Sequence, residues 1–395
     1  MSAAPMNVGA SAVNKWELAG LTLLFAVVLA TFVLQHQALL VAGSVICGIY
    51  GVAANRKTRV NPAHATLILV ALLLFLPAFF KPYFGLTPPF YVAATIAHLL
   101  AAMAVSRHSP HTLLAAFKIL FAVSVVGIAA ALYVYWGVPE PLGEIIDGSS
   151  TNGIPAYLIL LQVGLSLFSY IAHGRVPILS PILTGAVAFY GYGRGSLVVA
   201  ALILAFSLVL NFMLAHRAGR FRQLVTYCVL IALTATLLWN AEDLAQLLND
   251  YTKLGAGLAD PNRAEIWDQY VGKIDGWTLL FGADYAGTII ETVRAGNPHI
   301  AYIRTHAFFG LPVTLAALLS PLVVLFAPKT WGSRLIACAF LTMATMRAAS
   351  EPILFPTLLD FFYLAYIFAF FRHAPAYESA RSAQPHLVDP TSCNP

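Results

Sequence analysis

The chain has 395 residues, of which 59% are hydrophobic and 10% are charged, and its formal net charge is +5. A soluble domain carries roughly a quarter charged residues. This composition therefore excludes an ordinary water-soluble fold and predicts an all-α polytopic membrane protein. The modest positive charge gives information on membrane orientation rather than on a nucleic-acid partner, which we do not expect.

Apolar runs long enough to cross a hydrocarbon core of about 30 Å recur along the chain. Breaks at charged residues and at Pro and Gly clusters divide them into twelve predicted membrane-spanning helices. In chain order these are 17–35, 37–54, 63–80, 87–105, 112–136, 154–172, 177–192, 196–215, 223–240, 300–327, 334–350 and 352–371. The first run has no convincing cleavage site, so we interpret it as an uncleaved span.

The spans divide the chain into four regions. Residues 1–240 hold nine predicted spans, and residues 300–372 hold three. Between them, residues 241–299 form a long outer loop whose apolar residues recur at helical spacing, which predicts short helices packed over the outer face of the bundle. Residues 373–395 are polar and rich in Pro and Ser, and we expect a disordered cytoplasmic tail.

The distribution of charge predicts the orientation. With both termini in the cytoplasm of a bacterial inner membrane, 13 of the 22 Lys and Arg residues lie inside, most of them in short loops, as the positive-inside rule requires. Thirteen of the 17 acidic residues lie outside, nine of them in the long loop. Both counts place the long loop in the periplasm.

The first candidate functional residue is Arg194, in the segment FYGYGRGSLVV at the predicted outer edge of the membrane. An arginine at this depth costs free energy unless it has an anionic partner. Gly193 and Gly195 permit a sharp turn and a close approach of the backbone. The alternative is an interfacial arginine whose charge simply reaches the headgroups. The glycine spacing is not a nucleotide-binding fingerprint.

The second candidate is Arg263, which we expect in the first turn of a helix in the long loop. The helix dipole mildly disfavours a cation at that end, which indicates a purpose other than helix stability. A solvated or salt-bridged charge beside Glu265 and Asp268 is the alternative.

The third candidate is His299, in GNPHIAYIRTHAFFGLP, where the long loop ends and a span begins. Histidine is the side chain best suited to take a proton near neutral pH. His306 follows two helical turns later and is a possible supporting residue. A buried structural histidine is the alternative for both.

A further candidate pair is Arg347 and Glu351, at the end of the span 334–350. Residues of opposite charge at i and i+4 can simply neutralise each other. In the functional alternative, Glu351 orients the histidine or an arginine. The sequence contains no HExxH motif and no Cys/His ligand cluster, so we predict no metal site.

In order and spacing, these motifs resemble the O-antigen ligases and related O-antigen polymerases, which are membrane glycosyltransferases of Gram-negative bacteria. An Arg-Gly pair opens a span, an arginine with Trp267 four residues later lies in the long loop, and a histidine closes the loop. Tyr302, Ile303 and Gly310 also fall where that family has similar residues. Ile300 departs from it, because asparagine usually follows the histidine.

The resemblance implies a glycosyltransferase that needs no cofactor or metal and no protein partner. The donor would be a glycan on undecaprenyl pyrophosphate and the acceptor a sugar hydroxyl, joined on the periplasmic side. Arg194 and Arg263 would bind the pyrophosphate, and His299 would take the proton of the acceptor hydroxyl.

Three functions stay open on these grounds. A ligase would transfer finished polysaccharide to the lipid A core oligosaccharide, which we favour, whereas a polymerase would transfer it to a second lipid-linked repeat. A transporter or lipid flippase also needs many spans, but the notable charges here gather at the outer face and no internal repeat is apparent.

Overall fold

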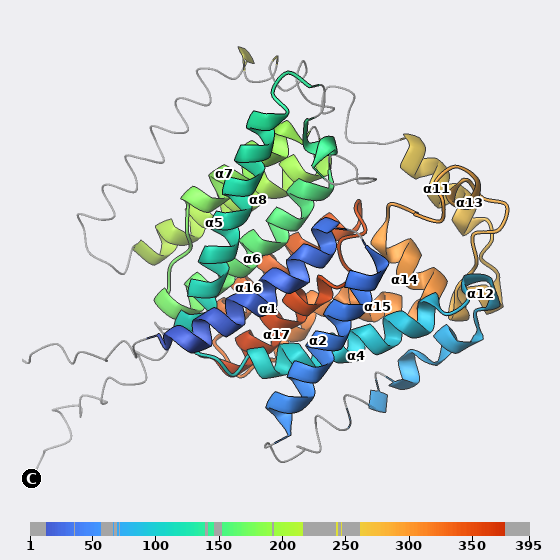
Figure 1. Ribbon diagram of the computed structural model, residues 1–395, viewed down its shortest axis with the longest axis horizontal. Helices are drawn as coiled ribbons and strands as arrows, with labels where there is room; N and C mark the ends of the chain where they lie inside the picture. Colours follow the sequence, from blue (N-terminus) through green and yellow to red (C-terminus); the bar gives the residue numbers. More distant parts are fainter. Residues whose placement is uncertain are drawn as a thin grey trace, which may run out of the picture.

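The computed structural model describes residues 13–34, 36–56, 66, 69–70, 72–138, 141–145, 152–191, 193–215, 242–243, 246 and 261–375. Within these ranges the regular structure is helical throughout, as predicted (Figure 1). Six of the described helices have the length and apolarity needed to cross a membrane. They are α1 (Lys15–Leu34), α2 (Gln37–Asn55), α4 (Thr87–Val105), α5 (Pro110–Val134), α6 (Gly153–His173) and α8 (Arg194–Ala215).

Helix α6 lies at the centre of the bundle, and nearly all of its side chains are buried. It packs against α5, α8, α7 (Leu179–Tyr190), α16 (Trp331–Ala348) and α17 (Asp360–Arg372). The Tyr366 hydroxyl of α17 donates a hydrogen bond to the Leu160 carbonyl of α6 at 3.0 Å, and Gly164 leaves room for the same ring. Helix α6 is therefore the common packing partner that holds these five helices in position.

Apolar side chains remain exposed on the outer helices. Examples are Leu23 of α1, Val45 of α2 and Val126 of α5, each more than half exposed. In water such faces would be costly, whereas a hydrocarbon environment matches them. The described part of the chain is therefore apolar both in its core and on much of its surface.

The predicted span 300–327 is not one continuous helix. It consists of α14 (Ala301–Phe309), α15 (Leu311–Leu319) and the 3-10 helix η5 (Ser320–Phe326). The break lies at Gly310, whose φ of +78° is open mainly to glycine. Pro312 and Pro321 then stand in the first turns of α15 and η5, where their missing N–H groups have no helical role.

Other predicted spans also differ from the structure. Helix α17 begins at Asp360, so the span 352–371 was placed too early; Pro352 and Pro356 keep residues 352–359 out of a helix. The span 177–192 contains only the 12-residue helix α7. The described end of the span 63–80 contains the 3-10 helix η1 (Leu76–Phe80). The predicted span 223–240 and most of the predicted tail 373–395 lie outside the described residues.

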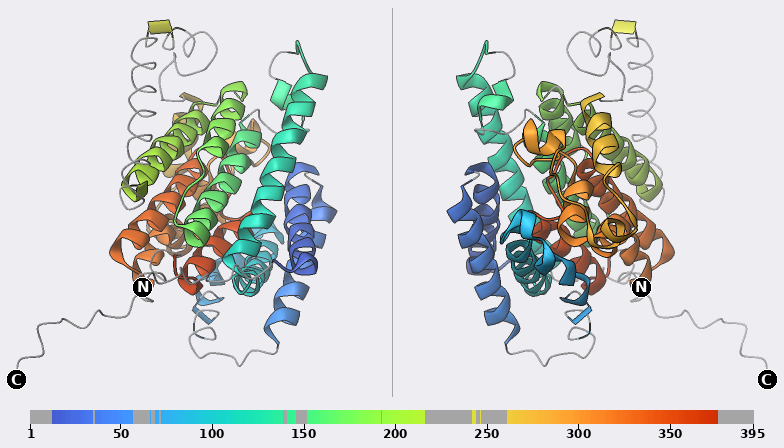
Figure 2. Two further views of the ribbon diagram at one scale, coloured as in Figure 1. Left: turned by 90° about the vertical axis from the view of Figure 1, so that its left-hand side faces the viewer. Right: turned by 90° about the vertical axis from the view of Figure 1, so that its right-hand side faces the viewer.

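Three short helices lie in the described residues 261–299, which belong to the segment predicted to form the long loop. They are α11 (Pro261–Val271), α12 (Gly276–Phe281) and α13 (Ile289–Thr292). They lie together at one side of the bundle, next to α14 (Figures 1 and 2). Ile266, Tyr270 and Ile290 form a second apolar core with Ile303 of α14 and Phe75. The loop is thus packed onto the bundle through a core of its own.

Two glycines allow α12 to approach the corner between α14 and α15 very closely. Gly282 and Gly310 both have positive φ. A Cβ atom at Gly282 would collide with the His306 carbonyl, and one at Gly310 would collide with the Leu280 carbonyl. This contact places the histidine segment 299–306 directly beside the loop helices.

Candidate functional site

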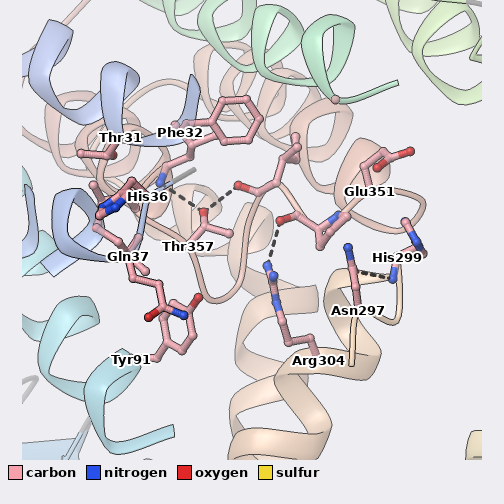
Figure 3. Close-up of a pocket in the computed structure, with 16 residues that line it drawn as sticks. Thr31, Phe32, His36, Gln37, Tyr91, Asn297, His299, Arg304, Glu351 and Thr357 are labelled. Atoms are coloured by element: carbon pink, nitrogen blue, oxygen red, sulfur yellow. Dashed lines mark hydrogen bonds between the residues drawn. The ribbon is translucent and has the colours of Figure 1, made fainter. Parts of the chain in front are cut away.

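A cavity of about 240 Å³ lies where the two halves of the chain meet (Figure 3). One wall comes from the α1–α2 connection and α4, with His36, Gln37 and Tyr91. The opposite wall comes from the end of the long loop, α14 and the segment after α16, with His299 and Glu351. The cavity therefore contains two residues that the sequence analysis singled out from separate motifs.

Glu351 is the centre of the charged part of the site. Its Oε1 lies 3.3 Å from Nη2 of Arg263 and 3.6 Å from Nη2 of Arg347. The exposed fraction of the side chain is 6% for Glu351, 1% for Arg347 and 28% for Arg263. One buried carboxylate thus holds two guanidinium groups, and it connects the predicted i,i+4 pair to the arginine of the long loop.

Arg347 also joins the start of α8 to this cluster. Its Nε donates to Ser196 Oγ at 2.8 Å, and its Nη1 donates to Ser350 Oγ at 2.6 Å. Its Nη2 donates to the Asn152 carbonyl at 3.3 Å. A buried arginine with these partners is hydrogen-bonded as well as paired, which offsets much of its desolvation cost.

The glycines around Arg194 make this contact possible. A Cβ atom at Gly193 would collide with Asn152, and one at Gly195 would lie 2.9 Å from Ser350 Oγ. Close backbone approach was the reason the sequence analysis gave for these glycines, and the structure shows it at both positions. The segment GRGS thus packs directly on the end of α16.

Arg194 itself is the first residue of α8 and is half-buried. It is not among the described residues that line the cavity. Its neighbour Ser196 nevertheless binds Arg347, which binds Glu351. The structure therefore brings Arg263 and Arg347 together on Glu351, and Ser196, two residues after Arg194, is linked to them through Arg347.

His299 has an unusual backbone conformation for a residue with a side chain. Its φ is +54°, and its N–H donates to Asn297 Oδ1 at 3.0 Å (Figure 3). Backbone conformations of this kind are costly and are found preferentially at functional sites. An asparagine thus supports this turn from two residues before the histidine. The position directly after the histidine is occupied by Ile300, whose side chain is fully buried.

His306 lies in a different environment and does not line the cavity. Its Nε2 is 2.8 Å from the Leu279 carbonyl, which can only accept, so Nε2 carries the proton. Its Nδ1 is 2.8 Å from the hydroxyl of Tyr270, which then donates to it. Both ring nitrogens are thus used to fasten α11 and α12 to α14, and the geometry does not favour the supporting role predicted for His306.

The loop is also fastened through a lysine. Lys81, between η1 and the 3-10 helix η2 (Pro82–Phe84), donates a hydrogen bond to the Gly282 carbonyl. Burial lowers the pKa of Lys81 to about 8, and Asp284 opposes this shift. Lys273 forms an ion pair with Asp284. The contact between loop and bundle is therefore polar at its edge as well as apolar at its centre.

Sequence reasoning missed one charged residue of the cavity, Arg304. It lies in the first turn of α14, and its Nη2 donates to the Pro352 carbonyl at 2.8 Å (Figure 3). In the sequence it was one of several outer basic residues. Its position five residues after His299 was the available signal, because a helix starting near His299 brings the side chain of its first turn back toward that end.

The chain was also compared with known proteins. No family model, no curated protein and no solved structure matches it. The resemblance to O-antigen ligases therefore depends on the order of the motifs alone.

The arrangement can perform two chemical tasks. Guanidinium groups held beside a cavity can bind an anion and neutralise charge that develops on it. An imidazole lining the same cavity can take a proton from a hydroxyl. Among the residues that the structure describes, no group of three His, Cys, Asp or Glu side chains is arranged as a metal site.

Proposed function

We propose that the protein is a membrane glycosyltransferase of the O-antigen ligase type. It transfers a glycan from undecaprenyl pyrophosphate to the lipid A core oligosaccharide. The observation that supports this most is that Glu351, which lines the same cavity as His299, binds Arg263 and Arg347. A base and an anion-binding group are the two components that such a transfer requires.

In the proposed reaction the acceptor hydroxyl oxygen attacks the anomeric carbon of the donor glycan. The new glycosidic C–O bond forms as the bond from that carbon to the pyrophosphate oxygen breaks. His299 takes the proton of the hydroxyl, and undecaprenyl pyrophosphate leaves with the bonding electron pair. Attack opposite the leaving group inverts the configuration of the anomeric carbon.

Arginine side chains neutralise the leaving group in this proposal, in the role that a metal ion has in many other glycosyltransferases. Arg263 is the partly exposed member of the cluster and is the one that reaches substrate. Arg194, at the start of α8, is the second pyrophosphate ligand. Glu351 and Arg347 position Arg263, because a guanidinium group paired on one edge presents its other edge in a fixed direction.

The site faces the periplasm of the inner membrane in this proposal, with both termini in the cytoplasm. Acidic residues concentrate in the long loop and the densest basic clusters in short loops on the opposite side. A lipid-linked donor then reaches the cavity from the outer leaflet without a nucleotide sugar.

Transfer by purified protein tests the proposal. Protein in lipid nanodiscs is supplied with an undecaprenyl pyrophosphate glycan and lipid A core acceptor, and product is followed by gel mobility. Transfer without a membrane gradient supports an enzyme, and its absence, with folded protein and authentic substrates, contradicts the proposal.

The acceptor distinguishes the ligase from the alternative, an O-antigen or exopolysaccharide polymerase. We expect lipopolysaccharide from a deletion strain to contain intact core without polymer. Core that carries a single repeat would instead identify a polymerase with the same chemistry.

A further inference from the structure

Among the described residues that line the cavity, Arg304 is the one arginine. It is half-buried, and among the described residues its one hydrogen-bond acceptor is the Pro352 carbonyl. Its Nε atom is buried and has no hydrogen-bond partner. A guanidinium group has five N–H donors, so most of the hydrogen-bonding capacity of Arg304 is not used within the described part of the protein.

The charge of Arg304 is not balanced by a nearby acid. Glu351 is the acidic residue among those that line the cavity, and its Oε1 already contacts Arg263 and Arg347. Asp360 lies near enough to influence Arg304, but its carboxylate accepts hydrogen bonds from the N–H groups of Phe355 and Thr357. Within the described residues, Arg304 has no ion pair at 4 Å or less.

The position of Arg304 in its helix also makes its positive charge unfavourable. It lies in the first turn of α14, where the helix dipole disfavours a cation. Arg263 lies in the first turn of α11, and Arg194 opens α8. An anion in the cavity would offset both the unpaired charge of Arg304 and its unfavourable interaction with the helix dipole. It would pair with the guanidinium group and with the positive end of the helix.

We propose that Arg304 is a further anion-binding residue of the cavity and binds a phosphate of the polyprenyl pyrophosphate substrate. The inference rests on the proposed function and names a residue that the sequence motifs do not include. A phosphate group suits Arg304, since its guanidinium group can donate two parallel N–H bonds to two phosphate oxygens while it keeps its contact with the Pro352 carbonyl.

Binding of undecaprenyl pyrophosphate to nanodisc-embedded protein tests the inference independently of catalysis. Arg304→Gln removes the charge and keeps an N–H donor for the Pro352 carbonyl. We expect it to weaken binding at least about tenfold, which corresponds to about 1.4 kcal/mol. Binding of undecaprenol, which has the same lipid and no phosphate, should not change.

Arg294→Gln is the matched control. Arg294 is also a half-buried arginine of the outer side with a buried Nε that has no partner, but it is not among the residues that line the cavity. We expect its affinity to equal that of the wild type. Arg304→Lys retains the positive charge but lacks the planar guanidinium group that donates two parallel hydrogen bonds. It should recover part of the affinity, which would also confirm that the site folds.

The outcomes separate the two proposals. Wild-type protein that binds undecaprenyl pyrophosphate together with Arg304→Gln protein of equal affinity would overturn the inference and leave the proposed function standing. Wild-type protein that binds undecaprenyl pyrophosphate no better than undecaprenol would overturn both. Equal losses in the Arg304 and Arg294 variants would also overturn the inference, because the effect would then not depend on the cavity.

Discussion

Two polar regions of this molecule each include residues of the segment 299–306, and they use their charges differently. The first, the cavity cluster, consists of Arg263, His299, Arg304, Arg347 and Glu351. The second, the loop cluster, consists of Lys81, Tyr270, Lys273, Asp284 and His306.

In the loop cluster each of these side chains is bonded to another part of the protein. His306 uses both ring nitrogens, Lys273 pairs with Asp284, and Lys81 binds a carbonyl. In the cavity cluster two arginines, Arg263 and Arg347, share Glu351. Glu351, His299 and Arg304 line an open volume. The difference separates polar residues that hold the loop helices to the bundle from those that lie at a cavity. It assigns His306 to the first group and His299 to the second.

The largest expected effect tests this assignment directly. Replacing His299 with alanine should lower the transfer rate about 10²- to 10⁴-fold, the usual contribution of a general base. The thermal stability should stay close to that of the wild type, because His299 is half-buried at the end of a loop. Full transfer activity in this variant would remove His299 from the mechanism.

Glu351 provides the next largest effect, on stability. Glu351→Ala leaves Arg347 buried without its counter-charge, and we expect a loss of about 3–5 kcal/mol of folding free energy. Glu351→Gln, which keeps an oxygen acceptor, should lose less. Chemical denaturation in detergent measures both, and equal stability of all three proteins would contradict the described pairing.

His306 should show the opposite pattern to His299. His306→Ala removes a hydrogen bond from the Leu279 carbonyl and leaves the Tyr270 hydroxyl with the Ala283 carbonyl at 3.3 Å. We expect this to cost about 1–3 kcal/mol. The transfer rate of the folded fraction should change little. A large fall in rate with unchanged stability would show that the two clusters do not differ as described here.

The smallest expected effect concerns Lys81. Its pKa of about 8 in the folded protein lies below its ordinary value of 10.5, so the unfolded chain binds more protons between these values. Stability therefore rises as the pH increases from 8 to 10.5, and solvent screening of this partly exposed side chain reduces the size of the rise. Competitive acetylation should show a midpoint for Lys81 near pH 8, and a midpoint near 10.5 would contradict its burial.

The fold was predictable where one helix crosses without interruption. Hydropathy located α1, α2, α4, α5, α6 and α8 to within a few residues. It failed at Gly310 because apolar residues stand directly on both sides of the break, and apolarity does not report a backbone angle. The late start of α17 had a signal in Pro352 and Pro356, since a residue before proline avoids the helical conformation.

The site was predictable where it is local. The spacing of Arg347 and Glu351 predicts their contact, and the helix that begins at Pro261 places Arg263 in its first turn. The contact between Arg263 and Glu351 joins residues 88 positions apart in the chain. The periodicity of a sequence carries no information on a contact between such distant residues. For the same reason it does not predict the cavity that His299 lines together with the α1–α2 connection.

The close packing of Gly282 and Gly310 has a consequence for anyone who labels this protein. No side chain fits at either position, so α12 and the α14–α15 corner behave as one rigid part. A spectroscopic probe attached there would disturb the histidine segment itself. Val293, which is largely exposed, offers a place to report on the loop from outside that part.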